Sequence, residues 1–249
     1  MRMHVRSLMV LTTAAVLVLP ACGAGDADTE APTPTPAWSQ GTIPTTIQQL
    51  APVLLTGDDL PGQWIYGRGR SGIFVFCPQA GAESIQAADG LTWQADVQLD
   101  QIQDGATATT TPSPSTPIIT VDQWILAEDP TEVEGTFTAL RDGIEACYGP
   151  SSMTVRGVVG TADGSPLVAA PMAVPEVGDD RIGEFDTYPE GFPGSVHAGS
   201  PAYLHTAIIR DGPVLMAINI AEENASPTDQ QLTQDDIDTI ITTAAEKLP

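Results

Sequence analysis

Basic residues are scarce in this chain. Nine Lys plus Arg stand against 32 Asp plus Glu over 249 residues, which gives a formal net charge of -23. Nucleic-acid binding needs clustered Lys and Arg to displace counterions from phosphates, whereas the basic residues here are scattered singly. We therefore expect no nucleic-acid partner. Lys247 is the only lysine, and this preference for arginine is a compositional association with GC-rich genomes such as those of actinobacteria.

Recognisable catalytic motifs are also lacking. The chain has no GxSxG, SxxK, HExxH or phosphate-loop sequence, and aromatic residues make up only 5 %, which is low for a glycosidase groove. Ser195 and His197 lie two residues apart, and a strand would hold both on one face without making them a catalytic pair. We predict no catalytic residue and no cofactor, and a hydrolase with a noncanonical site stays an alternative.

Metal-binding spacings are missing as well. The acid pairs at 58–59, 179–180 and 235–236 lack the alternating oxygen ligands and central glycine of a calcium loop. Helix caps and solvated turns account for such pairs without a ligand. We therefore predict no metal site.

The longest early apolar run, from Leu8 to Leu19, is too short for a transmembrane helix and follows two arginines. It ends in Leu-Pro-Ala-Cys at 19–22, which resembles the lipobox of bacterial lipoproteins. The resemblance implies a signal peptide over 1–21, lipid on Cys22, and attachment to the extracytoplasmic face of the cell membrane. An ordinary secretory signal that leaves Cys22 unmodified is the main alternative.

Only three cysteines are present, and two remain once Cys22 carries lipid. An even pair in an exported protein favours a disulfide between Cys77 and Cys147. A reactive thiol or a metal site is the rival interpretation. Neither cysteine has a CxxC spacing or a nearby histidine to support it.

Low-complexity segments divide the chain. Residues 22–44 mix Gly, Pro, Thr and acids and predict a disordered tether, and residues 104–117 have the same chemistry inside the expected domain, where they predict a surface loop. The remaining sequence, 45–249, predicts a single α+β domain. In it, a twisted antiparallel sheet carries amphipathic helices and one internal disulfide.

Hydrophobic periodicity places the elements of that domain. Residues 91–99 alternate as a half-buried strand, 118–127 is its expected partner, and 203–209 with 214–220 predict a hairpin turning at Asp-Gly. Two helices stand out, each with an apolar stripe and an expected capping box. They are 131–147, capped by Thr131 and Glu134, and the segment from Thr233, capped by Thr233 and Asp236.

Three segments resemble the extracellular sensor domain of mycobacterial PknH-type receptor kinases and the lipoproteins that share it. They are LLTGDDLPGQW at 54–64, TEVEGTFTALRDGIEACYG at 131–149, and VLMAINIAEEN at 214–224 followed by DIDTIITTAAEKL at 236–248. The resemblance implies a ligand-binding or sensory role without catalysis. This chain departs from the family in having one internal cysteine pair and no kinase segment.

A ligand site is the last expectation. Phe185, Tyr188, Phe192 and Tyr203 lie in a Gly- and Pro-rich stretch that predicts a loop lining an apolar pocket. The alternative is that these rings only close the edge of the sheet. The sequence thus favours a non-catalytic envelope lipoprotein that binds a small molecule, lipid, glycan or envelope protein of unknown identity, with hydrolysis or lipid carriage as alternatives.

Overall fold

The computed structural model describes residues 43–44, 46–67, 95–101, 118–153, 165–192, 199–223 and 232–248. All of them belong to one compact unit that spans 34–249. None of the helices in these ranges has both the length and the apolar character needed to cross a membrane. The predictions for the signal peptide, Cys22, Cys77 and the loop at 104–117 lie outside the described residues.

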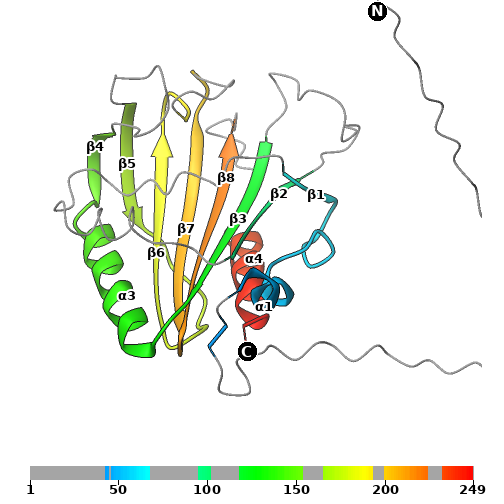
Figure 1. Cartoon of the computed structure of the whole chain (residues 1–249). Coiled ribbons are helices and arrows are strands. Elements are labelled where there is room, and N and C mark those ends of the chain that lie inside the picture. Colours follow the sequence, from blue (N-terminus) through cyan, green and yellow to red (C-terminus); the bar gives the residue numbers. More distant parts are fainter. Residues whose placement is uncertain are drawn as a thin grey trace, which may run out of the picture. The chain divides into compact units, whose positions relative to one another are not determined.

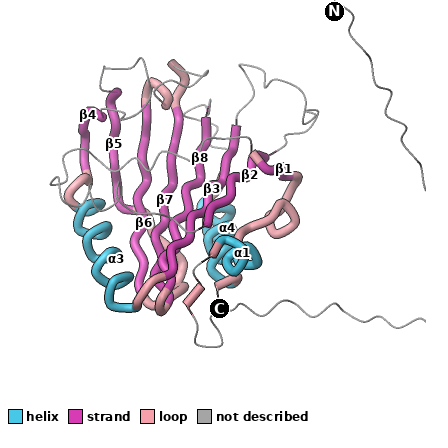
Figure 2. Tube along the Cα trace, viewed as in Figure 1, coloured by secondary structure: helices cyan, strands magenta, loops and turns pink. Residues whose placement is uncertain are grey.

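An antiparallel sheet dominates the described part of the chain. Its eight strands run in the order β1-β2-β3-β8-β7-β6-β5-β4 (Figure 1, Figure 2). Their bounds are β1 Trp64–Tyr66, β2 Ala95–Gln101, β3 Ile118–Ala127, β4 Gly149–Met153, β5 Ser165–Pro171, β6 Asp180–Tyr188, β7 Ala202–Asp211 and β8 Val214–Glu223. The sequence prediction of an antiparallel α+β fold is confirmed.

The strands form where the sequence alternates or is continuously apolar. β2 and β3 pair antiparallel, as expected across the 104–117 segment. β7 and β8 form the predicted hairpin, in which Gly212 has a φ of 52°, a conformation that glycine adopts without strain. These central strands are almost wholly buried, because side chains cover both faces of the sheet.

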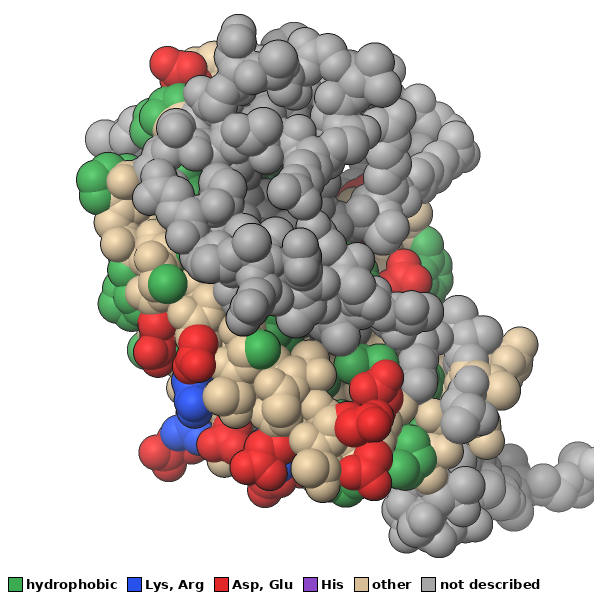
Figure 3. Space-filling model, turned by 60° about the vertical axis from the view of Figure 1, so that its left-hand side comes forward, with side chains coloured by type: hydrophobic (Ala, Val, Ile, Leu, Met, Phe, Trp, Pro, Cys, Tyr) green, Lys and Arg blue, Asp and Glu red, His purple; other side chains and the backbone are tan. Residues whose placement is uncertain are grey.

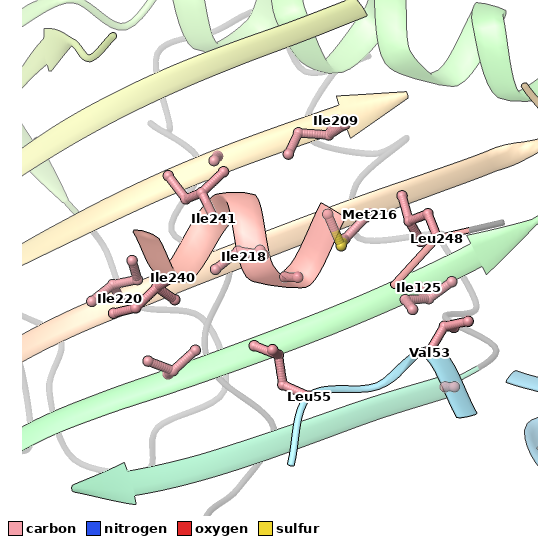
Figure 4. Packing of buried hydrophobic residues seen from close by; sticks show 14 of the residues in the cluster. Val53, Leu55, Ile125, Ile209, Met216, Ile218, Ile220, Ile240, Ile241 and Leu248 are labelled. Carbon is pink, nitrogen blue, oxygen red and sulfur yellow. The ribbon is translucent and has the colours of Figure 1, made fainter. Parts of the chain in front are cut away.

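The larger apolar cluster lies on the face covered by α4, Gln234–Glu246, which we call the α4 face. Ile240, Ile241 and Leu248 pack over sheet residues such as Ile218 and Met216 (Figure 4). The short helix α1, Ile47–Leu50, and the 3-10 turn η2, Ala51–Val53, join the same cluster from the other side of β3. Pro52 lies in the first turn of η2, where its missing N–H costs no hydrogen bond.

The cap of α4 is as the sequence predicted. Thr233 precedes the helix, and its side chain and that of Asp236 bond each other's backbone in a capping box. The predicted apolar stripe from Ile237 to Leu248 is buried. This helix therefore begins where its own sequence satisfies the exposed N–H groups.

The opposite face carries α3, Pro130–Glu145, and we call it the α3 face. The predicted stripe is confirmed, because Val133, Phe137, Leu140, Ile144 and Cys147 are all buried. Its apolar cluster includes Trp124, Leu126, Ile182, Ile208, Leu215 and Ala217 of the sheet. Alternate residues of a strand point to opposite faces, so α3 and α4 sandwich the central strands between them.

The predicted cap of α3 was wrong. The helix starts one residue earlier, at Pro130, and Asp129 is the N-cap, accepting a hydrogen bond from the Thr131 backbone at 2.9 Å. Proline suits the first helical position because its missing N–H would be unpaired there. At the other end the helix stops at Glu145 with Ala146 as its C-cap, and Gly149, with a φ of 117° that suits glycine, starts β4.

Candidate functional site

Five buried polar side chains gather on the α3 face beyond the cluster that α3 covers. We call this group the polar layer, and its members are Asp122, Glu184, Asp186, Thr206 and Asn219. It lies between two apolar clusters of the same face. One is the α3 cluster, and the other contains Leu167, Tyr188, Ala202 and Leu204.

The register of the sheet places four of these side chains in one row. Asp122 of β3 pairs with Asn219 of β8, which pairs with Thr206 of β7, which pairs with Glu184 of β6. Paired residues in an antiparallel sheet share a face, so the row crosses four strands. Asp186 stands two residues further along β6 and therefore on the same face.

Several oxygens of the polar layer have no hydrogen-bond partner in the part of the chain that the structure describes. They are both carboxylate oxygens of Asp186, Oδ1 of Asp122 and Oδ1 of Asn219, and their side chains belong to residues only 1 %, 7 % and 3 % exposed, respectively. Oε1 of the flanking Gln98, whose residue pairs with Asp122, is unpaired too. An unpaired buried polar group costs about 1–3 kcal/mol, so the layer is held at the expense of stability.

Burial also changes the acidity of the layer. It raises the pKa of Asp122 to about 7, and the nearby charges of Asp100 and Asp96 raise it further. Burial likewise raises the pKa of Asp186 to about 7. Tyr148, at the end of the α3 segment, has a raised pKa because of burial first and then the charges of Glu184, Glu145 and Asp186. With pKa values of about 7, the carboxyls of Asp122 and Asp186 change charge near neutral pH.

Basic side chains within the described ranges are engaged elsewhere. Arg210 pairs with Asp180 and lies 3.5 Å from Asp179, and Arg141, Arg181 and Lys247 pair with Asp142, Glu176 and Asp59. All of these acidic partners lie outside the polar layer. Acidic side chains outnumber basic ones on the face drawn in Figure 3, where they lie around a small group of basic side chains.

Buried polar side chains of the α4 face are paired, by contrast. Oε1 of Gln123 accepts a hydrogen bond from the Leu55 backbone at 2.7 Å, and its Nε2 donates to the Val53 carbonyl at 3.4 Å. His205 and Glu222 lie 3.3 Å apart, and Glu222 also accepts from the Leu232 backbone at 3.3 Å. These groups tie loops and helix ends to the sheet.

The four aromatic residues predicted to line a pocket do not form one site. Phe185 and Tyr188 lie in the regular strand β6 and Tyr203 lies in β7, so the expected loop is limited to the region of Phe192. Phe185 stacks on Tyr203 on the α4 face with ring centroids 5.9 Å apart. Tyr188 meets Phe192 edge to face at 4.8 Å, in the apolar cluster beside the polar layer. The odd and even positions of β6 separate the two pairs.

Other sequence-predicted positions are placed only in part. Cys147 is buried two residues after the end of α3, but Cys77 lies outside the described residues, so the disulfide stays a prediction. Ser195 and His197 lie outside them as well. Within the described residues, no three His, Cys, Asp or Glu side chains converge as they would around a metal ion.

The polar layer itself was missed by the sequence analysis. Its signal was present in part, because Glu184 and Asp186 recur at an interval of two in β6 and Asp122 interrupts the apolar sequence of β3. An interval of two puts both acids of β6 on one face of that strand. An acid on a surface-facing strand would have the same spacing, so burial had to come from the structure.

Comparisons with known proteins were made for the whole chain. No protein-family model matches it, and no curated protein matches it. Among solved structures, the chain is similar to the crystal structure of the extracellular domain of PknH from Mycobacterium tuberculosis, at 16 % sequence identity and a TM-score of 0.48. The match covers 82 % of this chain and 96 % of that one.

Proposed function

We propose that this protein is a non-catalytic ligand-binding or sensory protein of the cell envelope, and that the polar layer is its binding site. The observation that carries the proposal is the set of buried acceptor oxygens on Asp122, Asp186 and Asn219 that find no partner among the described residues. A fold under selection for stability alone gains nothing from such groups, whereas a binding site uses them to recognise a ligand.

The extracytoplasmic, lipid-anchored location belongs to the same proposal. It is supported by the lipobox-like segment at 19–22 and the apolar run before it. The Thr- and Pro-rich stretch that follows would hold the domain away from the membrane surface. Mass spectrometry of the mature amino terminus tests this, since an unacylated Cys22 would contradict the anchor.

A polar ligand fits the layer better than an acyl chain does. Each carboxyl and amide oxygen of the layer would lose hydration without gaining a hydrogen bond if a hydrocarbon covered it. Lipid carriage is therefore the weaker of the binding alternatives. A ligand that donates hydrogen bonds to Asp186 and Asn219 would remove the penalty that these groups now impose.

Nuclear magnetic resonance of the isotope-labelled full chain tests the site. The side-chain amide of Asn219 reports on the polar layer, and that of Gln123, on the α4 face of the same sheet, is a matched control. Three probes cover the ligand classes: a neutral oligosaccharide, the linear polyamine spermine, and vesicles of anionic phospholipid. A change in the chemical shift of the Asn219 amide, with no change at the Gln123 amide, supports the proposal. If no probe produces such a change, the proposal is overturned.

Acid–base hydrolysis is a second candidate with its own observation. Glu184 and Asp186 share a face of β6 two residues apart, about 7 Å along the strand. That spacing is in the range of paired carboxyls in glycosidases, and a carboxyl with a pKa of about 7, as at Asp186, suits a general acid. Hydrolysis of chromogenic glycosides that is abolished by Asp186→Asn would favour this function over binding alone.

A further inference from the structure

The unpaired atoms of the polar layer define what its ligand must offer. Those on Asp122, Asp186 and Asn219, and the one on the flanking Gln98, are all oxygens. An ionised carboxylate and an amide oxygen accept hydrogen bonds and cannot donate them. The ligand must therefore be rich in hydrogen-bond donors, which are either neutral, as in hydroxyl and amide groups, or cationic, as in ammonium groups.

Charge separates these two possibilities. Asp122 lies close enough to Asp100 and Asp96 for their charges to affect it, and Asp186 shares its face of β6 with Glu184. The four basic side chains of the described ranges pair with carboxylates outside the polar layer. Hydroxyl groups would donate hydrogen bonds to these carboxylates but would leave their negative charge uncompensated. Ammonium groups donate hydrogen bonds and also neutralise the charge.

Asp122 stands at one end of the row, and Asp186 stands two residues beyond Glu184, which forms the other end. Asp122 lies on β3 and Asp186 on β6, with the neutral side chains of Asn219 and Thr206 on the two strands between them. Three inter-strand steps of about 4.8 Å separate Asp122 from Asp186 by roughly 14 Å across the sheet, and two residues along β6 add an offset of about 7 Å along the strands. Ligands of a single metal ion must all lie within about 2.6 Å of it, so one ion cannot serve both ends.

We infer that the polar layer binds an elongated organic cation with an ammonium group at each end, a ligand of the linear polyamine class. One ammonium group pairs with Asp122 and the other with Asp186. The methylene segments between them pass over Thr206 and Asn219, whose polar atoms bond any inner amine. This inference rests on the proposed function, because it names the ligand of the same site.

Isothermal titration calorimetry of the full chain with spermine tests it, in roughly 0.15 M salt so that exposed charges are screened. We expect Asp122→Asn and Asp186→Asn each to weaken binding by at least about tenfold, because each removes one buried charge pair. Asp58→Asn makes the same charge change at an exposed position of the 54–64 segment, and it should leave the affinity unchanged. The short diamine 1,4-diaminobutane should bind at least about tenfold more weakly than spermine, since it spans only one end.

The outcomes separate the two proposals. If the neutral oligosaccharide moves the Asn219 amide and spermine does not, the binding site stands and the polyamine inference fails. If spermine binds all three variants and the parent equally, it is held by surface charge and the inference fails. If no probe moves Asn219, both proposals fail.

Proton release gives an independent readout. Asp122 faces Asp100 and Asp96, while Asp186 faces Glu184 and Tyr148, and both carboxyls have a pKa of about 7 before the ligand binds. A bound ammonium group favours their ionised forms, so binding at pH 7 should release protons and should tighten from pH 6 to pH 8. Calorimetry in two buffers of different ionisation enthalpy measures the release. Binding to exposed acids, which are already ionised at pH 7, would release none and would overturn the inference.

Discussion

Asp122 and Gln123 are neighbours in β3, yet the two faces of the sheet use them in opposite ways. Gln123 points to the α4 face, where its amide bonds the backbone of Val53 and Leu55 and fastens that segment to the sheet. Asp122 points to the α3 face, where its Oδ1 has no partner and its pKa is raised. One buried polar group stabilises the fold, and the other is retained in spite of its cost to stability.

The same contrast holds further along the sheet. On the α4 face, Glu222 bonds His205 and the Leu232 backbone just before α4 begins. On the α3 face, both carboxylate oxygens of Asp186 are unpaired. The difference is seen within β3 and again between β8 and β6, and it teaches that the buried polar groups of the α4 face contribute to stability whereas those of the α3 face reduce it.

The largest expected effect concerns pH. Burial raises the pKa of Asp122 from 3.8 to about 7 in the folded state, so the folded chain holds this proton more tightly than the unfolded chain. Stability should therefore fall as pH rises from about 4 to about 7 and then level off, by up to about 4 kcal/mol from this group. Asp122→Asn should remove that loss and be more stable than the parent at pH 8. Urea denaturation of the parent and the variant at pH 4, 6 and 8 measures the free energy of unfolding. If stability depends on pH equally in both, the contrast between Asp122 and Gln123 is contradicted.

A matched pair of substitutions tests the two faces directly. Gln123→Leu leaves the Leu55 N–H and the Val53 carbonyl without their partner, and we expect a loss of about 2–3 kcal/mol. Asn219→Leu removes an acceptor that is already unpaired, and the loss should be below about 1 kcal/mol. Chemical denaturation under one condition compares them. Equal losses would show that both faces depend on their polar groups for stability.

A smaller effect is expected at the helix that covers the α4 face. Thr233→Ala breaks the capping box that Thr233 makes with Asp236 and should cost about 1 kcal/mol. Because α4 and Asn219 lie on opposite faces of the sheet, the chemical shift of the Asn219 amide should not change in the variant. A thermal melt gives the stability, and a spectrum of the variant checks that the two faces respond separately.

The smallest effect is expected where α4 ends. Asp59 would be a weaker acid through burial alone, but hydrogen bonds from Lys247 and Thr56 outweigh this and lower its pKa. Because the pKa is lowered by folding, the ionised carboxylate stabilises the fold at pH values above the ordinary pKa of the unfolded chain. This stabilisation is lost as the pH falls through the lower pKa of the folded chain. Lys247→Met should cost below about 1 kcal/mol at pH 7 and nothing at pH 2. A cost that persists at pH 2 would mean that packing, and not the ion pair, is responsible.

Much of the fold was predictable because its signals are local. The apolar stripes of α3 and α4, the Asp-Gly turn after β7 and the Thr233 capping box each depend on residues within a few positions of one another. The α3 cap was assigned incorrectly because Asp129 and Thr131 both have capping side chains. Pro130 at the first helical position favours the earlier start.

The candidate site was not predictable in the same way. Phe185 and Tyr188 were expected to share a pocket, but three residues along a strand reverse the side of the sheet that a side chain faces. Asp122, Thr206, Asn219 and Glu184 become neighbours only through the pairing of β3, β8, β7 and β6. Strand order of that kind is not written in any local pattern.

By itself, the sequence determined the elements, their apolar faces and the acidic character of the chain, because periodicity and charge are properties of short segments. The tertiary structure alone decided which acids became buried and whether a buried polar group found a partner. Both depend on which strands lie side by side and on what covers them. Gln123 and Asp122 differ by one position in the chain, and the packing of the two faces gives them different environments.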